Sequence, residues 1–332
     1  TGPALSASLV AITIGISRAV PKRRSANVIG ALRPEKIEKR LTIAAHYDSS
    51  YRTRGRLLTL WVRLTRVPLM TILVILVALR AAGVLSEWPA WPVAWGALAS
   101  VFLPTCIAMF MALERRVTPG ANDNASGVAV MLEVARAVTE SPPKGVELTF
   151  VGLGAEEQGL FGSKEFGRRI RPKKTAVLNL DTVGTGSLFH YIRGNGIIRK
   201  LKTAEELNEE LRRAGKNVGL RVEPMWAPLA GHDHIPLIRA GFPATTLTAA
   251  DLQSHRLDRF IRRVFRIPDA GTRQYRHLHT LEDTPEQVEL ANIEGAGKIA
   301  LEFIKVHAKE TEGGEKSEDR TDVGHARQTR CS

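Results

Sequence analysis

Short apolar strands alternate with amphipathic helices along most of this chain, and this alternation constrains its fold more than any other feature. The pattern is continuous after residue 117 and closes with a helix that begins at a proline. It predicts an α/β fold with a mixed, largely parallel central sheet flanked by helices on both faces. The predicted strands are 41–45, 146–153, 175–180 and 243–248, and the predicted helices are 125–138, 159–169, 199–214 and 285–308.

An apolar region, residues 57–113, separates the first predicted strand from the others. Residues 67–79 are apolar, and residues 88–113 run for 26 positions without a charged side chain. A membrane-spanning helix needs about 20 apolar residues, and the Trp and Pro residues between the two runs suit an interfacial turn. We therefore predict an integral membrane hairpin of two spans, inserted in the α/β domain. A buried helical pair of a soluble domain is the alternative.

Arginines lie at both ends of this hairpin, close to the α/β domain, and the positive-inside tendency places that domain on the cytoplasmic side. They are Arg52, Arg54, Arg56, Arg63, Arg66, Arg115 and Arg116. Residues 3–17 are uncharged but short for a span, so a further membrane segment, a signal remnant and a core helix all fit them. The predicted organisation is 1–52 for the first part of the α/β domain, 53–116 for the hairpin, 117–308 for the remainder and 309–332 for a disordered tail.

The net charge of +13 suggests an anionic partner, which is either nucleic acid or a membrane surface. The sequence has no zinc finger, no RNP-like motif and no basic helix with interleaved aromatics, so nucleic acid is not expected as a partner. Its two cysteines are too few for a cysteine-based zinc site. Motifs for phosphate loops, dinucleotides, H-E-x-x-H metalloproteases and G-x-S-x-G hydrolases are also missing. The sequence does not indicate an oligomeric state.

Carboxylates and imidazoles stand at the ends of several predicted elements. In α/β sheets, sites form beyond the carboxyl ends of the strands, and these groups all fall at that edge. Each one alone fits a solvated loop, a turn or a cap, but together they form a set of metal-competent side chains. Carboxylate and imidazole without thiolate suit Zn²⁺ and related divalent ions. The candidates are His46, Asp48, Asp123, Glu156, Glu157, Asp181 and His279.

Short segments that contain these residues carry a more specific resemblance. In chain order they are AHYDS, GANDNASGVAVMLEVAR, GAEEQGLFGS, LNLDTVG and HTLEDT, and GHDHIPLIRAGFPATTL (231–247) adds a further match. They resemble segments of the di-zinc aminopeptidase family, metallopeptidase family 28, of the aminopeptidase Y and bacterial leucyl aminopeptidase type. The match covers about residues 25–50 and 117–308 and implies a zinc-exopeptidase-like fold.

The resemblance implies a cofactor of two Zn²⁺ per chain, and it leaves cobalt and manganese open. Carried over by position, His46 and Asp181 bind one ion, Glu157 and His279 bind the other, and Asp123 bridges both.

The remaining roles that the resemblance implies are catalytic or positional. Glu156 matches the general base of the family, and Asp48 matches the carboxylate that orients the first histidine ligand. His232, Asp233 and His234 are not made ligands by the resemblance. We expect them to shape the pocket or to cap the helix that follows.

The function predicted from these residues is a membrane-associated, zinc-dependent aminopeptidase that acts on peptides. It would hydrolyse N-terminal residues by a two-metal, Glu-assisted attack of water. Two alternatives stay open on the same scaffold. One is a glutaminyl-cyclase-like acyltransferase with one zinc, and the other is a non-catalytic membrane scaffold.

Overall fold

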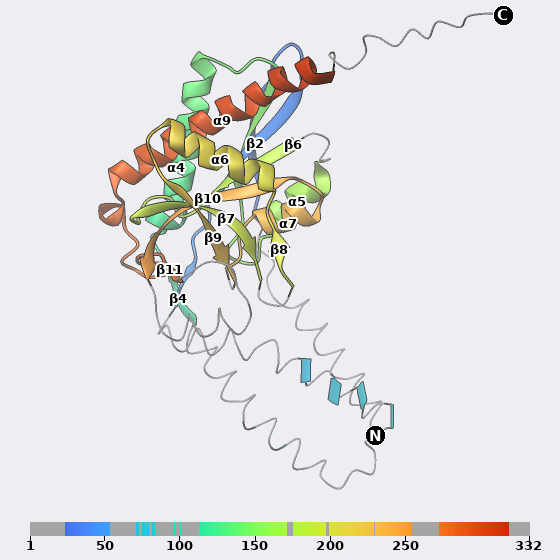
Figure 1. Cartoon of the computed structure of the whole chain (residues 1–332). Coiled ribbons are helices and arrows are strands. Elements are labelled where there is room, and N and C mark those ends of the chain that lie inside the picture. Colours follow the sequence, from blue (N-terminus) through green and yellow to red (C-terminus); the bar gives the residue numbers. More distant parts are fainter. Residues whose placement is uncertain are drawn as a thin grey trace, which may run out of the picture. The chain divides into compact units, whose positions relative to one another are not determined.

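The computed structural model describes residues 24–53, 113–170, 175–196, 199–228, 230–253 and 272–318, together with isolated positions between 71 and 100. The chain divides into two compact units. The larger is made of Ser25–Ser50 and Thr118–Ser332, and the smaller is made of Thr1–Arg24 and Tyr51–Val117. The larger unit contains the α/β sheet and the helices that cover it (Figure 1).

Nine strands of the described residues form the sheet of the larger unit. They are β1 (Val28–Leu32), β2 (Lys39–His46), β5 (Val146–Leu153), β6 (Thr175–Leu180), β7 (Leu188–Asn195), β8 (Leu201–Lys202), β9 (Val222–Ala227), β10 (Ala244–Gln253) and β11 (Thr272–Gln274). Their order is β1-β5-β2-β6-β10-β7-β8, with β11 beside β10 and β9 beside β7. The neighbours β5, β2, β6 and β10 are parallel, and so are β7 and β9. The pairs β1 with β5, β10 with β7, β7 with β8 and β10 with β11 are antiparallel. The predicted mixed, largely parallel sheet is therefore confirmed.

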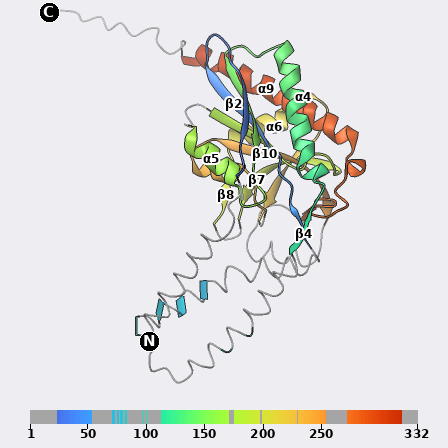
Figure 2. The same ribbon diagram turned by 180° about the vertical axis from the view of Figure 1, so that it is seen from behind.

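The central strands are apolar on both faces because helices cover both faces. One layer consists of α4 (Ser126–Glu140), α6 (Glu205–Asn217) and α9 (Leu290–Glu318), and the other of α5 (Phe161–Arg169) and α7 (His234–Arg239). Figures 1 and 2 show these two layers from the front and from behind. Neighbouring residues of β6 divide between them, since Leu178 packs in the core with α4, α6 and α9, and Val177 packs in the core with α5 and α7.

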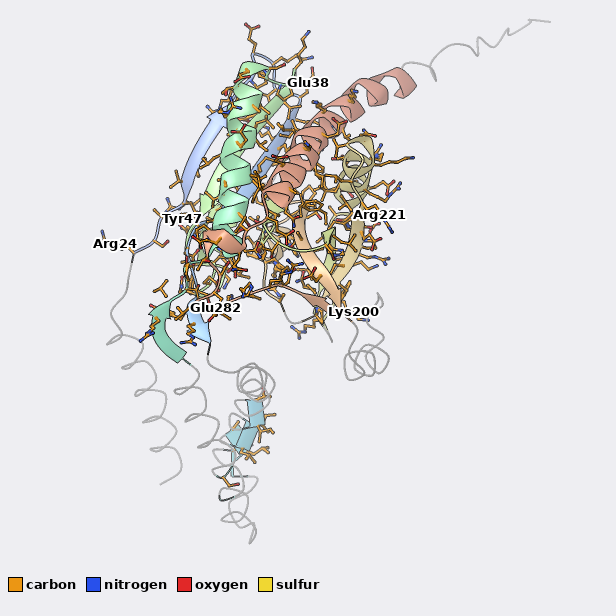
Figure 3. The ribbon with its side chains drawn as sticks, turned by 90° about the vertical axis from the view of Figure 1, so that its left-hand side faces the viewer. Arg24, Glu38, Tyr47, Lys200, Arg221 and Glu282 are labelled. Atoms are coloured by element: carbon orange, nitrogen blue, oxygen red, sulfur yellow. The ribbon has the colours of Figure 1, made fainter. Side chains whose placement is uncertain are left out.

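The parallel pairing brings the carboxyl ends of β2, β5 and β6 to one edge of the sheet. His46 at the end of β2 is in register with Leu153 at the end of β5, and Ala44 pairs with Asn179 of β6. Figure 3 shows Glu38 and Tyr47 at opposite ends of β2, with Glu282 on the side of Tyr47. Residues that follow these three strands are therefore placed close together.

The last helix differs from the prediction at both ends. Pro285 begins a short turn, η2 (Pro285–Gln287), and α9 itself begins at Leu290. The helix continues to Glu318, past residue 308 and into the segment predicted as a disordered tail. The residues around 308, such as Lys309 and Glu310, are good helix formers, which lets the helix continue beyond the part that packs on the sheet.

In the smaller unit, β3 (Tyr51–Thr53) and β4 (Leu113–Val117) form an antiparallel ribbon. None of the helices in the described part of the chain is both long and apolar enough to cross a bilayer. The two predicted spans in 57–113 lie outside the described residues, apart from isolated positions, and so do residues 3–17 and 319–332.

Candidate metal centre

His46 is the last residue of β2, and its ring is buried. Its Nδ1 lies 3.1 Å from the main-chain oxygen of Asp48. Its Nε2 lies 3.2 Å from Oδ1 of Asp123 and 3.8 Å from Oδ1 of Asp181. A ring whose Nδ1–H donates to a carbonyl presents its Nε2 as the atom available to a metal, so His46 faces the carboxylates in the orientation of a ligand.

Asp123 lies in the turn η1 (Ala121–Ala125), directly before α4, and the peptide bond that follows it is cis. Its two oxygens face different histidines. Oδ1 faces His46, as described above, and Oδ2 lies 3.2 Å from Nε2 of His279. A single buried carboxylate is therefore shared between two imidazole rings, which is the position of a bridging group.

Glu157 completes the surroundings of His279. Its Oε1 lies 3.2 Å from Nε2 of His279. This oxygen is buried, and apart from the ion-pair contact with His279 it has no hydrogen-bond partner among the described residues. A buried carboxylate oxygen without a hydrogen bond is costly unless a cation or a proton satisfies it. The site therefore offers an orphaned oxygen in the place where a metal ligand was predicted.

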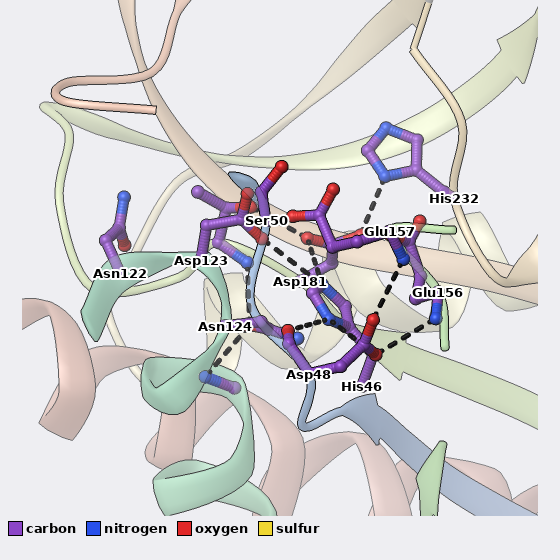
Figure 4. A network of polar contacts seen from close by, with 12 residues as sticks. His46, Asp48, Ser50, Asn122, Asp123, Asn124, Glu156, Glu157, Asp181 and His232 are labelled. Carbon is purple, nitrogen blue, oxygen red and sulfur yellow. Dashed lines mark hydrogen bonds and ion pairs between the residues drawn. The ribbon is translucent and has the colours of Figure 1, made fainter. Parts of the chain in front are cut away.

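The five predicted ligands come together as two sets of three that share Asp123. One set is His46, Asp123 and Asp181, and the other is Asp123, Glu157 and His279. In each set the candidate ligand atoms lie within 4.8 Å of one another. Figure 4 shows His46, Asp123, Asp181 and Glu157 pointing into the same small volume. Imidazole nitrogens and carboxylate oxygens in this arrangement fit Zn²⁺.

The adjacent glutamates have different surroundings, although both follow β5. Glu157 faces His279. The pKa of Glu156 is raised to about 10, mainly by burial. His46 lowers this pKa, and the carboxylates of Asp181, Asp233 and Glu157 raise it. The turn that carries the pair is tight, because a Cβ at Gly162 would collide with the main chain of Gly154. Glu157 thus lies among the candidate ligands, and Glu156 lies next to them without belonging to either set.

The electrostatics of the cluster favour positive charge. Burial opposes protonation of His279, but contacts with Asp123 and Glu157 raise its pKa to about 10. The pKa of His46 is likewise raised by Asp123 and Asp181, against the effect of burial. The excess of carboxylates keeps the imidazoles protonated, and a bound cation would neutralise the same carboxylates in place of these protons.

The structure corrects the role expected for Asp48. The Nδ1–H of His46 donates to the main-chain carbonyl of Asp48, whereas the carboxylate of Asp48 lies 3.8 Å from that nitrogen. Oδ1 and Oδ2 of Asp48 instead accept the N–H groups of Glu156 and Glu157, at 2.9 and 3.1 Å. The reason is that β2 and β5 are neighbours in register, so the turns after them meet. Asp48 fixes the main chain that carries both glutamates.

Asp283 has a similar role that was not predicted from the sequence. It is buried, and its two carboxylate oxygens accept the N–H groups of Asn122 and Asp123, at 2.7 and 3.1 Å. Asp283 follows His279 by four positions, inside the segment HTLEDT that the resemblance had already singled out. That proximity to a ligand was the available signal. The hydrogen bonds of Asp283 therefore connect the segment that contains His279 to the turn that contains Asp123.

Asn124 joins the Asp123 turn to the end of β6. Its Nδ2 donates to the carbonyl of Leu180 at 2.9 Å, and its Oδ1 accepts the N–H of Thr182 at 3.0 Å. Asp181 lies between these two contacts. The position of Asp181 relative to Asp123 is therefore set by hydrogen bonds to the main chain on both sides of it.

Comparison with known proteins places this geometry in a family. The sequence model of Peptidase family M28 matches residues 107–304. The chain belongs to peptidase family M28. Aminopeptidase YwaD of Bacillus subtilis (strain 168) is 28% identical over 194 residues, which are 56% of this chain and 37% of YwaD. The family predicted from the sequence segments is confirmed.

Solved structures share the fold of this M28 chain. The zinc aminopeptidase BSAP from Bacillus subtilis has a TM-score of 0.50 and 22% identity, over 84% of this chain and 48% of BSAP. Glutaminyl cyclase from Porphyromonas gingivalis has a TM-score of 0.53 and 17% identity, over 85% of this chain and 77% of the cyclase. The chain spans less than half the length of either Bacillus protein. Because both activities occur on this fold, the fold alone does not choose between them.

Of the two roles expected for the segment GHDH of this M28 chain, capping of the next helix is not observed. Asp233 stands at the start of α7 but makes no capping hydrogen bond with its side chain. His232 instead contacts a predicted ligand, since its Nδ1 lies 2.8 Å from Oδ2 of Asp181. The sequence predicted that His232 shapes the pocket, but it did not predict the contact with Asp181.

Proposed function

We propose that this member of family M28 is a zinc-dependent aminopeptidase that removes N-terminal residues from peptides with two Zn²⁺ ions per chain. The observation that carries the proposal is the meeting of all five predicted ligands at one edge of the sheet, in two sets that share Asp123. A relative named as an aminopeptidase supports the choice of reaction.

Each ion has three protein ligands in this proposal. His46, Asp123 and Asp181 hold one, and Asp123, Glu157 and His279 hold the other. Bound there, the ions supply Lewis-acid polarisation of the scissile carbonyl and a lower pKa for the attacking water. Three protein ligands at each position leave room for water or substrate, as in other catalytic zinc sites.

Glu156 is the proposed general base. It is half-buried near His46, Asp181 and Glu157, and Asp48 holds its main-chain N–H in place. Added positive charge among the neighbouring carboxylates lowers the pKa of Glu156 from its raised value, because those carboxylates are part of what raises it. In its ionised form Glu156 accepts a proton from the attacking water and then returns it to the departing amine.

The experiment that tests this proposal combines peptide cleavage with metal analysis. The purified full chain is expected to release N-terminal residues from short unblocked peptides and to leave their N-acetylated forms intact. A chelator should abolish turnover, and added Zn²⁺ should restore it, since the attack of water depends on the metal. Metal analysis of the active protein should give two ions per chain.

Other results point to the alternatives. One ion per chain, with cyclisation of N-terminal glutamine, would identify a glutaminyl-cyclase-like acyltransferase. A folded chain that binds no metal after exposure to zinc and cleaves no peptide would identify a non-catalytic scaffold. Either outcome contradicts the aminopeptidase proposal.

We also propose that the chain is integral to a membrane, with the catalytic unit on the cytoplasmic side. The uncharged run 88–113, the apolar run 67–79 and the arginines around them support this proposal. In cells, the full chain is expected to stay with membranes through alkaline carbonate washing and to be released by detergent. Protease added outside intact cells should leave the catalytic unit uncut. Recovery in the soluble fraction or in the carbonate wash contradicts membrane integration.

A further inference from the structure

His232 contacts the proposed metal centre, although it belongs to neither set of candidate ligands. It lies between β9 and α7, and its side chain is buried. Its Nδ1 lies 2.8 Å from Oδ2 of Asp181, as Figure 4 shows. The other oxygen of Asp181, Oδ1, accepts a hydrogen bond from Oγ1 of Thr182 at 2.7 Å and faces Nε2 of His46.

The direction of this hydrogen bond follows from the role of Asp181 as a candidate metal ligand. A carboxylate that binds a metal is ionised, and an ionised carboxylate can only accept hydrogen bonds. It follows that Nδ1 of His232 carries the proton and donates it to Oδ2, which leaves Oδ1 on the side of His46.

The ring of His232 is held firmly from its other side. It stacks on His234, with ring centroids 5.6 Å apart and an angle of 22° between the rings. His234 is itself fixed at both nitrogens, by Oγ1 of Thr246 on β10 and by Oδ1 of Asn195 on β7, each at 2.6 Å. Burial lowers the pKa of His234 well below its usual value, so this supporting ring is neutral. Through His234, strands β7 and β10 thus fix the orientation of the His232 ring and of its N–H donor.

We propose that His232 is a positioning residue for the metal position formed by His46, Asp123 and Asp181, and that it sets the affinity of that position selectively. Its N–H fixes one oxygen of Asp181, so that the other oxygen points at the metal. Hydrogen-bond donors behind a ligand typically contribute 10–100-fold to metal affinity. Glu157 and His279 have no contact with His232 among the described hydrogen bonds and ion pairs, so the second position keeps its affinity. This inference rests on the proposed metal centre.

The test compares two substitutions in the full chain by titrating metal-free protein with Zn²⁺ in a calorimeter, and with Co²⁺ by visible absorption. His232→Leu removes the donor and is expected to weaken one of the two metal positions by about 10–100-fold. His232→Asn places its Nδ2–H near the position of the imidazole Nδ1–H, and it is expected to retain most of the affinity. The Co²⁺ spectrum should change in His232→Leu and resemble that of the wild type in His232→Asn.

The chain offers a matched control in His307. This residue of α9 is also buried, and its Nδ1 makes the same contact with a carboxylate, 2.8 Å from Oε2 of Glu210. It lies beside the start of β2, because its carbonyl accepts a hydrogen bond from Lys39, whereas His46 is at the end of that strand. His307→Leu removes an equivalent buried donor away from the centre. It is expected to leave both metal affinities unchanged.

Three results overturn the inference. The first is His232→Leu binding both ions as the wild type does. The second is an equal loss at both metal positions, which indicates a general disturbance of the fold. The third is a loss in His232→Asn as large as that in His232→Leu. A wild-type chain that fails to bind two ions in the same titration overturns the proposed metal centre itself, which separates the two failures.

Discussion

Glu156→Gln is expected to lower kcat about 10²–10⁴-fold, which is the usual contribution of a general base, while the chain still binds two metal ions. Glutamine has the shape of glutamate but cannot accept a proton from the attacking water. The substitution leaves both sets of candidate ligands complete, because Glu156 belongs to neither of them. The measurements are steady-state kinetics on an unblocked peptide and the metal content of the same sample.

The matched control is the same substitution one residue later. Glu157→Gln removes a candidate ligand of the second position, and it is expected to lower the metal content as well as the rate. Two adjacent glutamates that follow the same strand should therefore give different results, one a loss of turnover alone and the other a loss of metal. A nearly normal rate in Glu156→Gln refutes the role assigned to this residue.

The elements that carry the ligands could be predicted because their sequences are simple. β5 and β6 are rich in apolar residues, and the structure places them at the predicted residues, Val146–Leu153 and Thr175–Leu180. Parallel strands that are buried on both faces are typically rich in apolar residues at successive positions. Since ligands follow such strands directly, the edge of the sheet could be deduced before the order of the strands was known.

Two of the strands that were not predicted, β7 and β9, have mixed sequences. β7 contains the buried His190 together with Arg193, and β9 contains Pro224, which removes a main-chain donor. Neither strand has the apolar run or the strict alternation that predicts a strand, and the places of β7 beside β10 and of β9 beside β7 come from tertiary packing. The short helix α7 was expected only as the helix that follows GHDH, without bounds.

The candidate ligands could be named from the sequence, but the groups that hold them in place could not. Asp48, Asp283 and His232 act on residues far away in the chain, at Glu156, Asp123 and Asp181. Their partners depend on which turns meet in space, and a single sequence gives no information on this point. For Asp48 the correct residue was chosen with the wrong contact, because the sequence cannot distinguish a carboxylate that orients an imidazole from one that fixes a neighbouring turn.

Asp123→Asn is expected to remove both metal ions, and with them at least about 10³ in kcat/KM, because the ions supply several kcal/mol to the transition state. The reason is that Asp123 is the one residue common to both sets of candidate ligands. Asp283 holds this turn through main-chain N–H groups, which the substitution keeps, so the turn is expected to stay in place. The measurements are the zinc content per chain and the kinetics of peptide cleavage.

Asp181→Asn is the companion variant, since Asp181 belongs to only one set. It is expected to lose the ion beside His46 and to keep the ion beside His279, which gives about one ion per chain. The midpoint of urea unfolding for each metal-free variant provides the control for folding. It is expected to fall modestly in both variants, because each carboxylate pairs with an imidazole in the metal-free chain, but each variant should still unfold in one cooperative transition. If Asp123→Asn keeps one tightly bound ion while Asp181→Asn keeps none, Asp123 does not bridge, and the two positions are not built around a shared carboxylate.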